Sequence, residues 1–132
     1  MKVLALDYGS ARTGVAVSDA TGTLARPVGV VEQASSDAGL ARIVELVAEH
    51  EAQRVVVGLP LTMMGHHGEQ AVETDKFVRR LRETLGVPVE SFDERFTTDL
   101  AEQGGPSAHA TDAVAAAHLL SSYLTWSSRA SR

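Results

Sequence analysis

The fold predicted for this chain rests on the stretch Val3-Leu4-Ala5-Leu6-Asp7-Tyr8-Gly9-Ser10-Ala11-Arg12-Thr13-Gly14-Val15-Ala16-Val17-Ser18-Asp19. Its first four residues form a continuous apolar run, which is typical of a strand buried on both faces of an α/β sheet. A glycine-marked turn follows, and residues 14–18 are sufficiently β-branched to return as a hairpin partner. Asp7 is therefore expected where a buried strand opens towards solvent.

Two interpretations of Asp7 follow from that position. Burial of an unpaired carboxylate costs several kcal/mol unless a cation or a hydrogen-bond donor meets it, which favours a metal ligand. Asp7 could instead only cap the turn through its own backbone. On the residues of this stretch alone, both interpretations stay open.

The composition indicates one globular domain. The chain has 132 residues, of which 44% are hydrophobic and 22% charged, so disorder and membrane spans are not expected. We expect a single domain over residues 1–126, a disordered polar tail over 127–132 and a cytoplasmic location. The absence of cysteine excludes disulfides and thiolate chemistry, leaving carboxylates and histidines as candidate metal ligands. The formal charge of −5 argues against non-specific coating of nucleic acid.

The rest of the chain predicts a five-stranded mixed α/β sheet flanked by helices. Residues 24–32 form a third antiparallel strand, placed near an edge by Pro27. Further strands are expected over residues 54–60 and 87–92, and strand–helix–strand connections make these two parallel to the first strand. The predicted helices cover residues 37–50, 69–85, 96–102 and 112–123, with a flexible loop over 103–110 and with Thr111 capping the last helix.

Acidic residues fall at the ends of elements that such a sheet brings to one edge. Asp7 ends the first strand, Asp93 and Glu94 follow the fifth strand, and Asp112 opens the final helix. Ligands of open α/β sheets gather outside the carboxyl ends of the parallel strands. Carboxylates that converge there repel one another, and Mg²⁺ or Mn²⁺ would relieve the repulsion. Two such ions could clamp a phosphodiester during hydrolysis.

The ordered motifs of the chain resemble the YqgF/RuvX family, relatives of the Holliday-junction resolvase RuvC with an RNase H-like fold. The resemblance spans essentially the whole chain, and the ordered set is far more specific than any single motif. Its motifs are Leu6-Asp7-Tyr8-Gly9 with Arg12 and residues 14–19, Val57-Gly58-Leu59-Pro60-Leu61, Asp93-Glu94-Arg95-Phe96-Thr97-Thr98, and Asp112-Ala113-Val114-Ala115-Ala116.

This resemblance implies a metal-dependent endonuclease with Asp7, Glu94 and Asp112 as its catalytic, metal-holding acids, using Mg²⁺ or Mn²⁺. Asp93 is expected to be structural, because it points the opposite way along its strand. The family is usually assigned to processing the 5′ end of pre-16S ribosomal RNA, and some members to resolving branched DNA. A homodimer would suit a resolvase, because two strands require two sites.

Contacts to nucleic acid are expected from Arg12, Arg95, Thr62 and His109. Thr62 stands where the family commonly carries Asn, and His109 is the one basic candidate in a loop that is often rich in Lys and Arg. Each arginine could instead pair with a neighbouring acid. Similarly, Glu94 could pair with Arg95 or cap a helix. Asp112 could do no more than interact favourably with the dipole at the start of its helix. The basic residues of the second long helix, Lys76, Arg79, Arg80 and Arg82, are interpreted as a solvated surface.

Two rival functions come from other classes. A non-catalytic nucleic-acid-binding factor could share the fold, but such a protein has no use for carboxylates that face phosphates. A kinase or ATPase of the actin-like superfamily also begins with Asp-x-Gly and a hairpin. Such enzymes close a second lobe over the nucleotide, for which 132 residues are too few.

Overall fold

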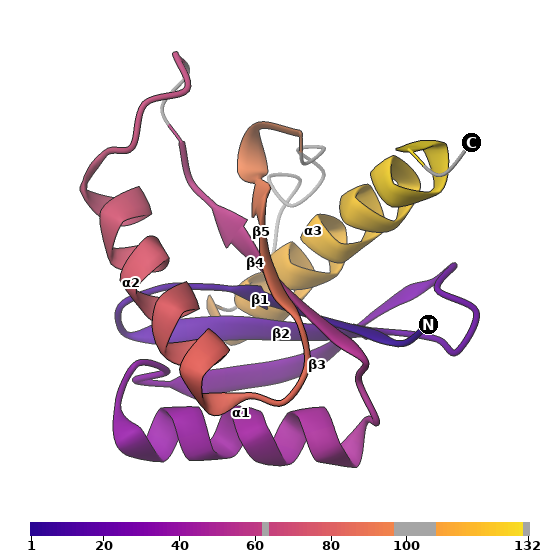
Figure 1. The fold of residues 1–132 in the computed structure, drawn as a ribbon, viewed down its shortest axis with the longest axis horizontal. Helices are drawn as coiled ribbons and strands as arrows, with labels where there is room; N and C mark the ends of the chain where they lie inside the picture. The colour runs from indigo at the N-terminus through magenta and orange to yellow at the C-terminus, as the bar shows by residue number, and fades with distance from the viewer. Residues whose placement is uncertain (62–63, 97–107, 131–132) are drawn as a thin grey trace.

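The computed structural model describes residues 1–61, 64–96 and 108–130, and Figure 1 shows the arrangement of its elements. The chain forms five strands, three α-helices and one short 3₁₀ helix. In chain order these are β1 (Val3–Asp7), β2 (Arg12–Ser18), β3 (Ala25–Glu32), α1 (Asp37–Glu49), β4 (Arg54–Leu59), α2 (Glu69–Thr84), β5 (Val89–Asp93), the 3₁₀ helix η1 (Glu94–Phe96) and α3 (Ala108–Ala130).

The sheet has the predicted mixed topology, with the strand order β3-β2-β1-β4-β5. β1, β2 and β3 pair in antiparallel fashion, and β4 and β5 run parallel to β1. Pro27, which has no N–H to donate, lies opposite Ala16 in the edge strand β3, beside a β-bulge. The parallel arrangement brings the carboxyl ends of β1, β4 and β5 to the same edge of the sheet.

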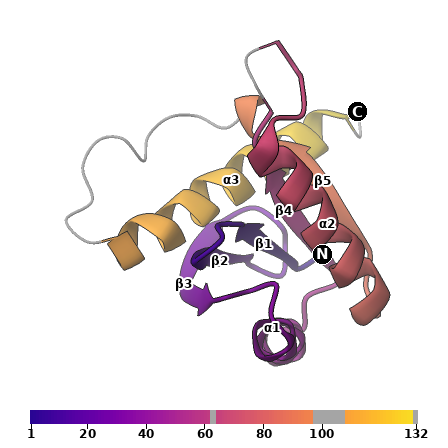
Figure 2. The ribbon, with the colours of Figure 1, turned by 90° about the vertical axis from the view of Figure 1, so that its left-hand side faces the viewer.

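Helices cover both faces of the sheet, with α1 and α2 on one side and α3 on the other (Figure 2). Leu4 and Leu6 of β1 pack into the cluster that contains α1 and α2. Val3 and Ala5, which alternate with them, pack against α3. β1 is thus buried on both faces, as its apolar run predicted, and its carboxyl end lines a cavity.

The last helix is longer than predicted at both ends. α3 starts at Ala108 rather than at residue 112, so Thr111 lies inside the helix, and it continues to Ala130 instead of giving way to a tail at residue 127. Alanines favour helix at its start. At its end Trp126 packs against Phe92 and Tyr123, with ring centroids 5.7 and 6.0 Å away, and this contact supports the final turns.

Two further predictions concern segments that the structure describes only in part. Of the helix expected over residues 96–102 only Phe96 is described, as the end of η1, and most of the loop expected over 103–110 also lies outside the described residues. No helix among the described residues is long and apolar enough to span a membrane.

Candidate functional site

An acidic cavity of about 400 Å³ lies where β1, β4 and β5 end. Asp7 contributes from the end of β1, Glu94 from η1 directly after β5, and the first two turns of α2 close one side. No lysine or arginine lines the described cavity, whereas four carboxyl side chains do. The lining consists of Asp7, Tyr8, Gly9, Ser10, Pro60, Glu69, Gln70, Glu73, Thr74 and Glu94.

Asp7 and Glu94 share a hydrogen bond in this cavity, although they are 87 positions apart in the sequence. Burial raises the pKa of Glu94 to about 8, and the hydrogen bond and negative charge of Asp7 add to the increase. Burial also raises the pKa of Asp7; the bond to Glu94 opposes this rise, and the charge of Asp112 adds to it. These directions indicate that the Glu94 carboxyl donates the shared proton and the Asp7 carboxylate accepts it.

Gly58 provides the space for the Glu94 carboxyl group. A Cβ atom on Gly58 of β4 would lie 2.5 Å from Oε1 of Glu94 and 3.0 Å from Cδ2 of Leu119. Such distances are too short for any side chain without movement of its neighbours. Glu94 therefore occupies the volume that a side chain at position 58 would fill.

Asp112 lies near this pair, but its carboxylate is bound to an arginine. Arg12 donates from Nε to Oδ2 of Asp112 over 2.9 Å. In the part of the chain that the structure describes, no three histidine or acidic side chains form a group able to hold a metal ion. The structure therefore brings Asp7 and Glu94 together, while the third predicted acid faces Arg12.

Asp93 binds Arg95 of η1 and is not among the residues that line the cavity. Its carboxylate accepts hydrogen bonds from the backbone N–H of Arg95 at 2.9 Å and from Nε and Nη2 of the same arginine at 3.0 and 2.6 Å. These bonds lower the pKa of Asp93. Arg95 thus pairs with Asp93, while the Glu94 carboxyl group hydrogen-bonds to Asp7.

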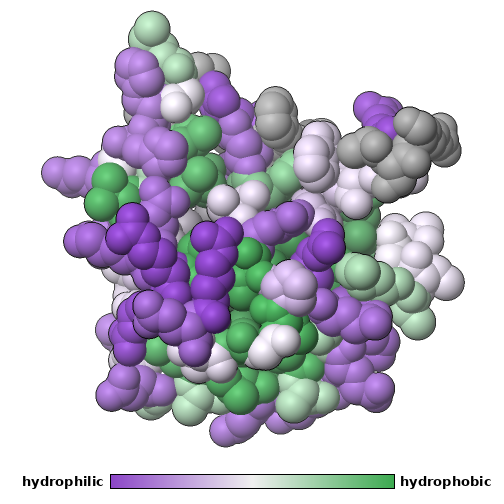
Figure 3. Space-filling view, in the orientation of Figure 1, coloured by the Kyte–Doolittle hydropathy of each residue, from purple (hydrophilic) through white to green (hydrophobic). Residues whose placement is uncertain are grey.

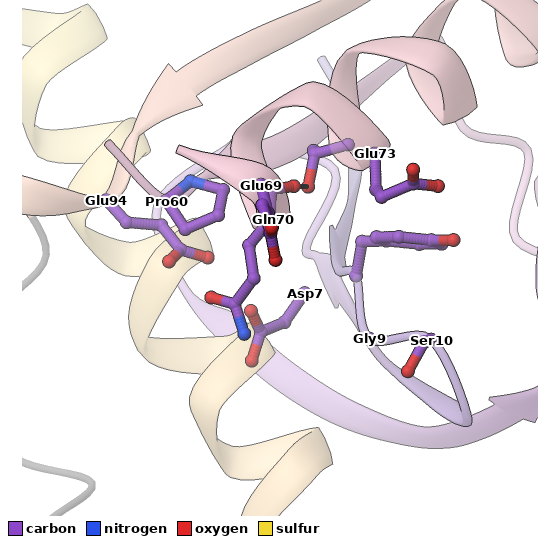
Figure 4. A pocket seen from close by; sticks show the side chains of 10 residues that line it. Asp7, Gly9, Ser10, Pro60, Glu69, Gln70, Glu73 and Glu94 are labelled. Atoms are coloured by element: carbon purple, nitrogen blue, oxygen red, sulfur yellow. Dashed lines mark hydrogen bonds between the residues drawn. The ribbon is translucent and has the colours of Figure 1, made fainter. Parts of the chain in front are cut away.

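The sequence interpretation missed the contribution of α2. Glu69, Gln70, Glu73 and Thr74 all line the cavity, and Figure 4 shows the side chains of Asp7, Gln70 and Glu94 converging on the same part of it. Thr74 is buried and donates to the backbone carbonyl of Gln70 over 2.7 Å. The spacing i, i+1, i+4, i+5 places these residues on one helical face, a signal that could have revealed them.

The residues predicted to contact nucleic acid differ in how far the structure describes them. Arg12 and Arg95 each pair with an acid, Thr62 lies outside the described residues, and His109 lies in the first turn of α3 with its side chain undescribed.

Several basic side chains of α2 bind within the chain. Lys76 pairs with Glu73 at 3.6 Å, Arg80 pairs with Asp37 at 3.2 Å, and Arg82 donates to the carbonyl of Val89 at 3.0 Å. Hydrophilic side chains accordingly cover α2 in Figure 3.

The donor set of the cavity fits a divalent cation that prefers oxygen ligands. Two buried carboxyl groups within hydrogen-bonding distance cannot both ionise at low cost unless a cation offsets their repulsion. Asp7 and Glu94 resolve this repulsion by sharing a proton, and Mg²⁺ or Mn²⁺ could replace that proton.

The shared proton predicts how stability depends on pH when no divalent cation is bound. The unfolded chain releases the Glu94 proton near pH 4.5, whereas the folded chain retains it to about pH 8. Between these values the folded state binds more protons, so the free energy of unfolding falls as pH rises. We expect the melting temperature in EDTA to drop by several degrees between pH 5.5 and pH 8. The drop in melting temperature should be smaller in Glu94→Gln, which has no carboxyl group to titrate. Scanning calorimetry of both proteins measures it. An equal drop in the variant would contradict the assignment of the retained proton to Glu94.

The sequence model of the family described as "RuvX: Holliday junction resolvase" matches residues 1–126. This match covers almost the whole chain. The chain belongs to the RuvX family. RuvX membership agrees with the motifs around Asp7, Glu94 and Asp112, all of which fall within the matched range.

Individual relatives support the same assignment to the RuvX family. A protein of Chloroflexus aggregans named "Putative pre-16S rRNA nuclease" is 48% identical over 101 residues, which cover 76% of this chain and 71% of that protein. A Chloroflexus aurantiacus relative of the same name is also 48% identical, with 66% of its length covered. A Syntrophomonas wolfei protein of that name is 35% identical, with 94% of each chain covered.

A solved structure shows the same fold. Thermus thermophilus RuvC in complex with a Holliday junction substrate has a TM-score of 0.59 to this chain, with 96% of each chain covered and 19% identity. The predicted RNase H-like fold is therefore confirmed.

Proposed function

We propose that this RuvX protein is a metal-dependent endonuclease that hydrolyses phosphodiester bonds in processing the 5′ end of pre-16S rRNA. The observation that carries the proposal is the Asp7–Glu94 carboxyl pair in an acidic cavity at the carboxyl ends of the parallel strands. The names of the relatives support the choice of substrate. A protein that only binds phosphates gains nothing from a cavity lined by carboxylates, since each repels the ligand.

The proposed metal-holding residues are Asp7, Glu94 and Asp112, and the proposed cofactor is a pair of Mg²⁺ or Mn²⁺ ions. Divalent ions at such a site activate a water molecule and offset the charge that develops on the leaving 3′ oxygen. Asp7 is the last residue of β1 and Glu94 directly follows β5, so the sheet positions both acids before substrate binds. Positioning and charge stabilisation then supply most of the catalysis.

Nucleic-acid phosphates must reach a site that is itself acidic on a chain of net charge −5. Arg12 and Arg95 are the proposed phosphate contacts beside the cavity, because guanidinium groups match phosphate oxygens in pairs. Thr62 and His109 are proposed as further contacts. Because so few basic side chains are proposed to contact phosphates, we expect the affinity for nucleic acid to fall only modestly as the salt concentration rises.

The second candidate function is resolution of branched DNA, which the family description favours. Both candidates use the same carboxylates and differ in the nucleic acid that fits around them. Symmetric cleavage of a junction needs two copies of the site, so this function would require a homodimer.

The deciding experiment incubates the protein with a labelled precursor-rRNA 5′ segment and with a labelled four-way DNA junction. We expect cleavage of the RNA in Mg²⁺ or Mn²⁺ and none in EDTA. Cleavage of the junction alone, by a protein that sediments as a dimer, would transfer the proposal to the second candidate. Tight binding without cleavage of either substrate would contradict both and indicate a non-catalytic assembly factor.

A further inference from the structure

Asp112 is held apart from the acids with which it is proposed to act. Its carboxylate accepts the Arg12 Nε–H at 2.9 Å, yet its charge is close enough to raise the pKa of Asp7. The three acids do not form a metal-holding group among the described residues. One of the three proposed metal-holding residues is thus engaged elsewhere, at short range from the site.

The backbone of Asp112 is already fixed beside the sheet. Its carbonyl oxygen lies so close to Gly14 of β2 that any Cβ at position 14 would overlap it. Ala113 and Ala116, which follow it on α3, are buried, and Ala116 packs with residues of the sheet. Because α3 cannot come closer, Asp112 can approach Asp7 only by rotation of its side chain.

We propose that Arg12 is a positioning residue that holds the Asp112 carboxylate away from Asp7 and Glu94 until a nucleic-acid phosphate binds its guanidinium group. This inference rests on the metal-dependent function proposed above. A phosphate presents two or three oxygens to the guanidinium fork, and so competes directly with the single hydrogen bond to Asp112. Asp112 then turns to the cavity, where its negative charge increases cation affinity.

The ion pair is accessible enough to act in this way. The side chains of Arg12 and Asp112 are 40% and 29% exposed, so an incoming phosphate can reach the guanidinium without opening the core. Ion pairs of this exposure are weak and open readily. Nucleic-acid binding and cation binding should consequently strengthen each other to the same degree.

A double-mutant cycle on cation binding tests the inference without relying on cleavage. Mn²⁺ affinity is measured by electron paramagnetic resonance of the free ion for wild type, Arg12→Gln, Asp112→Asn and the double variant, all without nucleic acid. Arg12→Gln should bind Mn²⁺ about fivefold more tightly than wild type, the factor expected for release of an exposed ion pair. In the Asp112→Asn background the same change should have little effect, and Arg12→Lys should restore affinity close to that of wild type.

The outcomes separate this inference from the general function. Arg12→Gln could tighten Mn²⁺ binding equally in the wild-type and Asp112→Asn backgrounds. That result would reflect only the loss of a nearby positive charge. It would overturn the positioning role of Arg12 and leave the metal site intact. If Arg12→Gln does not tighten Mn²⁺ binding in the protein that retains Asp112, the positioning role is overturned as well. Failure of every variant, wild type included, to bind Mn²⁺ would overturn the metal-dependent function and the positioning role together.

Discussion

Replacing Asp7 with asparagine is expected to slow metal-dependent cleavage by about a thousandfold or more, the loss typical when a group that holds charge in the transition state is removed. Asp7 is the acid that accepts the hydrogen bond from Glu94, and it lies at the carboxyl end of a strand whose other four residues are all buried. Asparagine keeps its shape but removes one charge from the cavity. Single-turnover cleavage of the precursor-rRNA segment, or of the DNA junction if that is the substrate cut, measures the effect.

Stability distinguishes a chemical defect from a folding defect in this variant. The negative charge of Asp112 lies close to Asp7, and an asparagine Oδ1 can still accept the hydrogen bond from Glu94, so Asp7→Asn should unfold at the same temperature as wild type or slightly higher in EDTA. Asp37→Asn is the matched control, because Asp37 is fully exposed in the first turn of α1. Cleavage by Asp7→Asn at the wild-type rate would refute the proposed mechanism.

The second large effect is expected from Gly58→Ala, which changes no charged or polar group. The added Cβ would lie 2.5 Å from Oε1 of Glu94 and 3.0 Å from Cδ2 of Leu119, so both side chains must move. Both atoms lie at the far ends of flexible side chains that can shift, so we expect a loss of stability of only about 1 kcal/mol. Because catalytic groups must be held within about 0.5 Å of their working positions, we also expect cleavage to slow by about a hundredfold.

Gly29→Ala is the matched control for Gly58→Ala. Gly29 also lies in a strand, but an added Cβ there meets no atom within 4 Å. This variant should retain both stability, measured by urea unfolding, and activity. If Gly58→Ala cleaves as fast as Gly29→Ala, then the position of Glu94 does not depend on the space at residue 58.

Local patterns predicted most of the architecture. The apolar run before Asp7 has no polar face, and so predicted a central strand covered on both sides. The glycine-marked turn after it and Pro27 in the third strand predicted an antiparallel hairpin whose last strand lies at the edge. The parallel edge that gathers Asp7 and Glu94 follows from chain connectivity, because right-handed strand–helix–strand units leave few other topologies.

Contacts between distant segments could not be predicted in this way. The last helix extends to Ala130 because Trp126 packs against Phe92 of β5, a contact that no local pattern predicts. The spacing of Glu69 and Glu73 places them on one face of α2, but this face lines the cavity only because the helix packs against β4 and β5.

The sequence by itself determined the class of fold, the antiparallel hairpin of the first three strands and the parallel direction of the last two, since these depend on hydrophobic periodicity, turn residues and connectivity. It also predicted the candidate acids from motif order. Tertiary structure alone decided which acids meet. Gly58 admits Glu94 to the cavity, and Gly14 brings α3 against β2 with Asp112 facing Arg12. Both arrangements depend on the space left between elements that are far apart in the chain. That space exists only once the sheet and its helices have packed together.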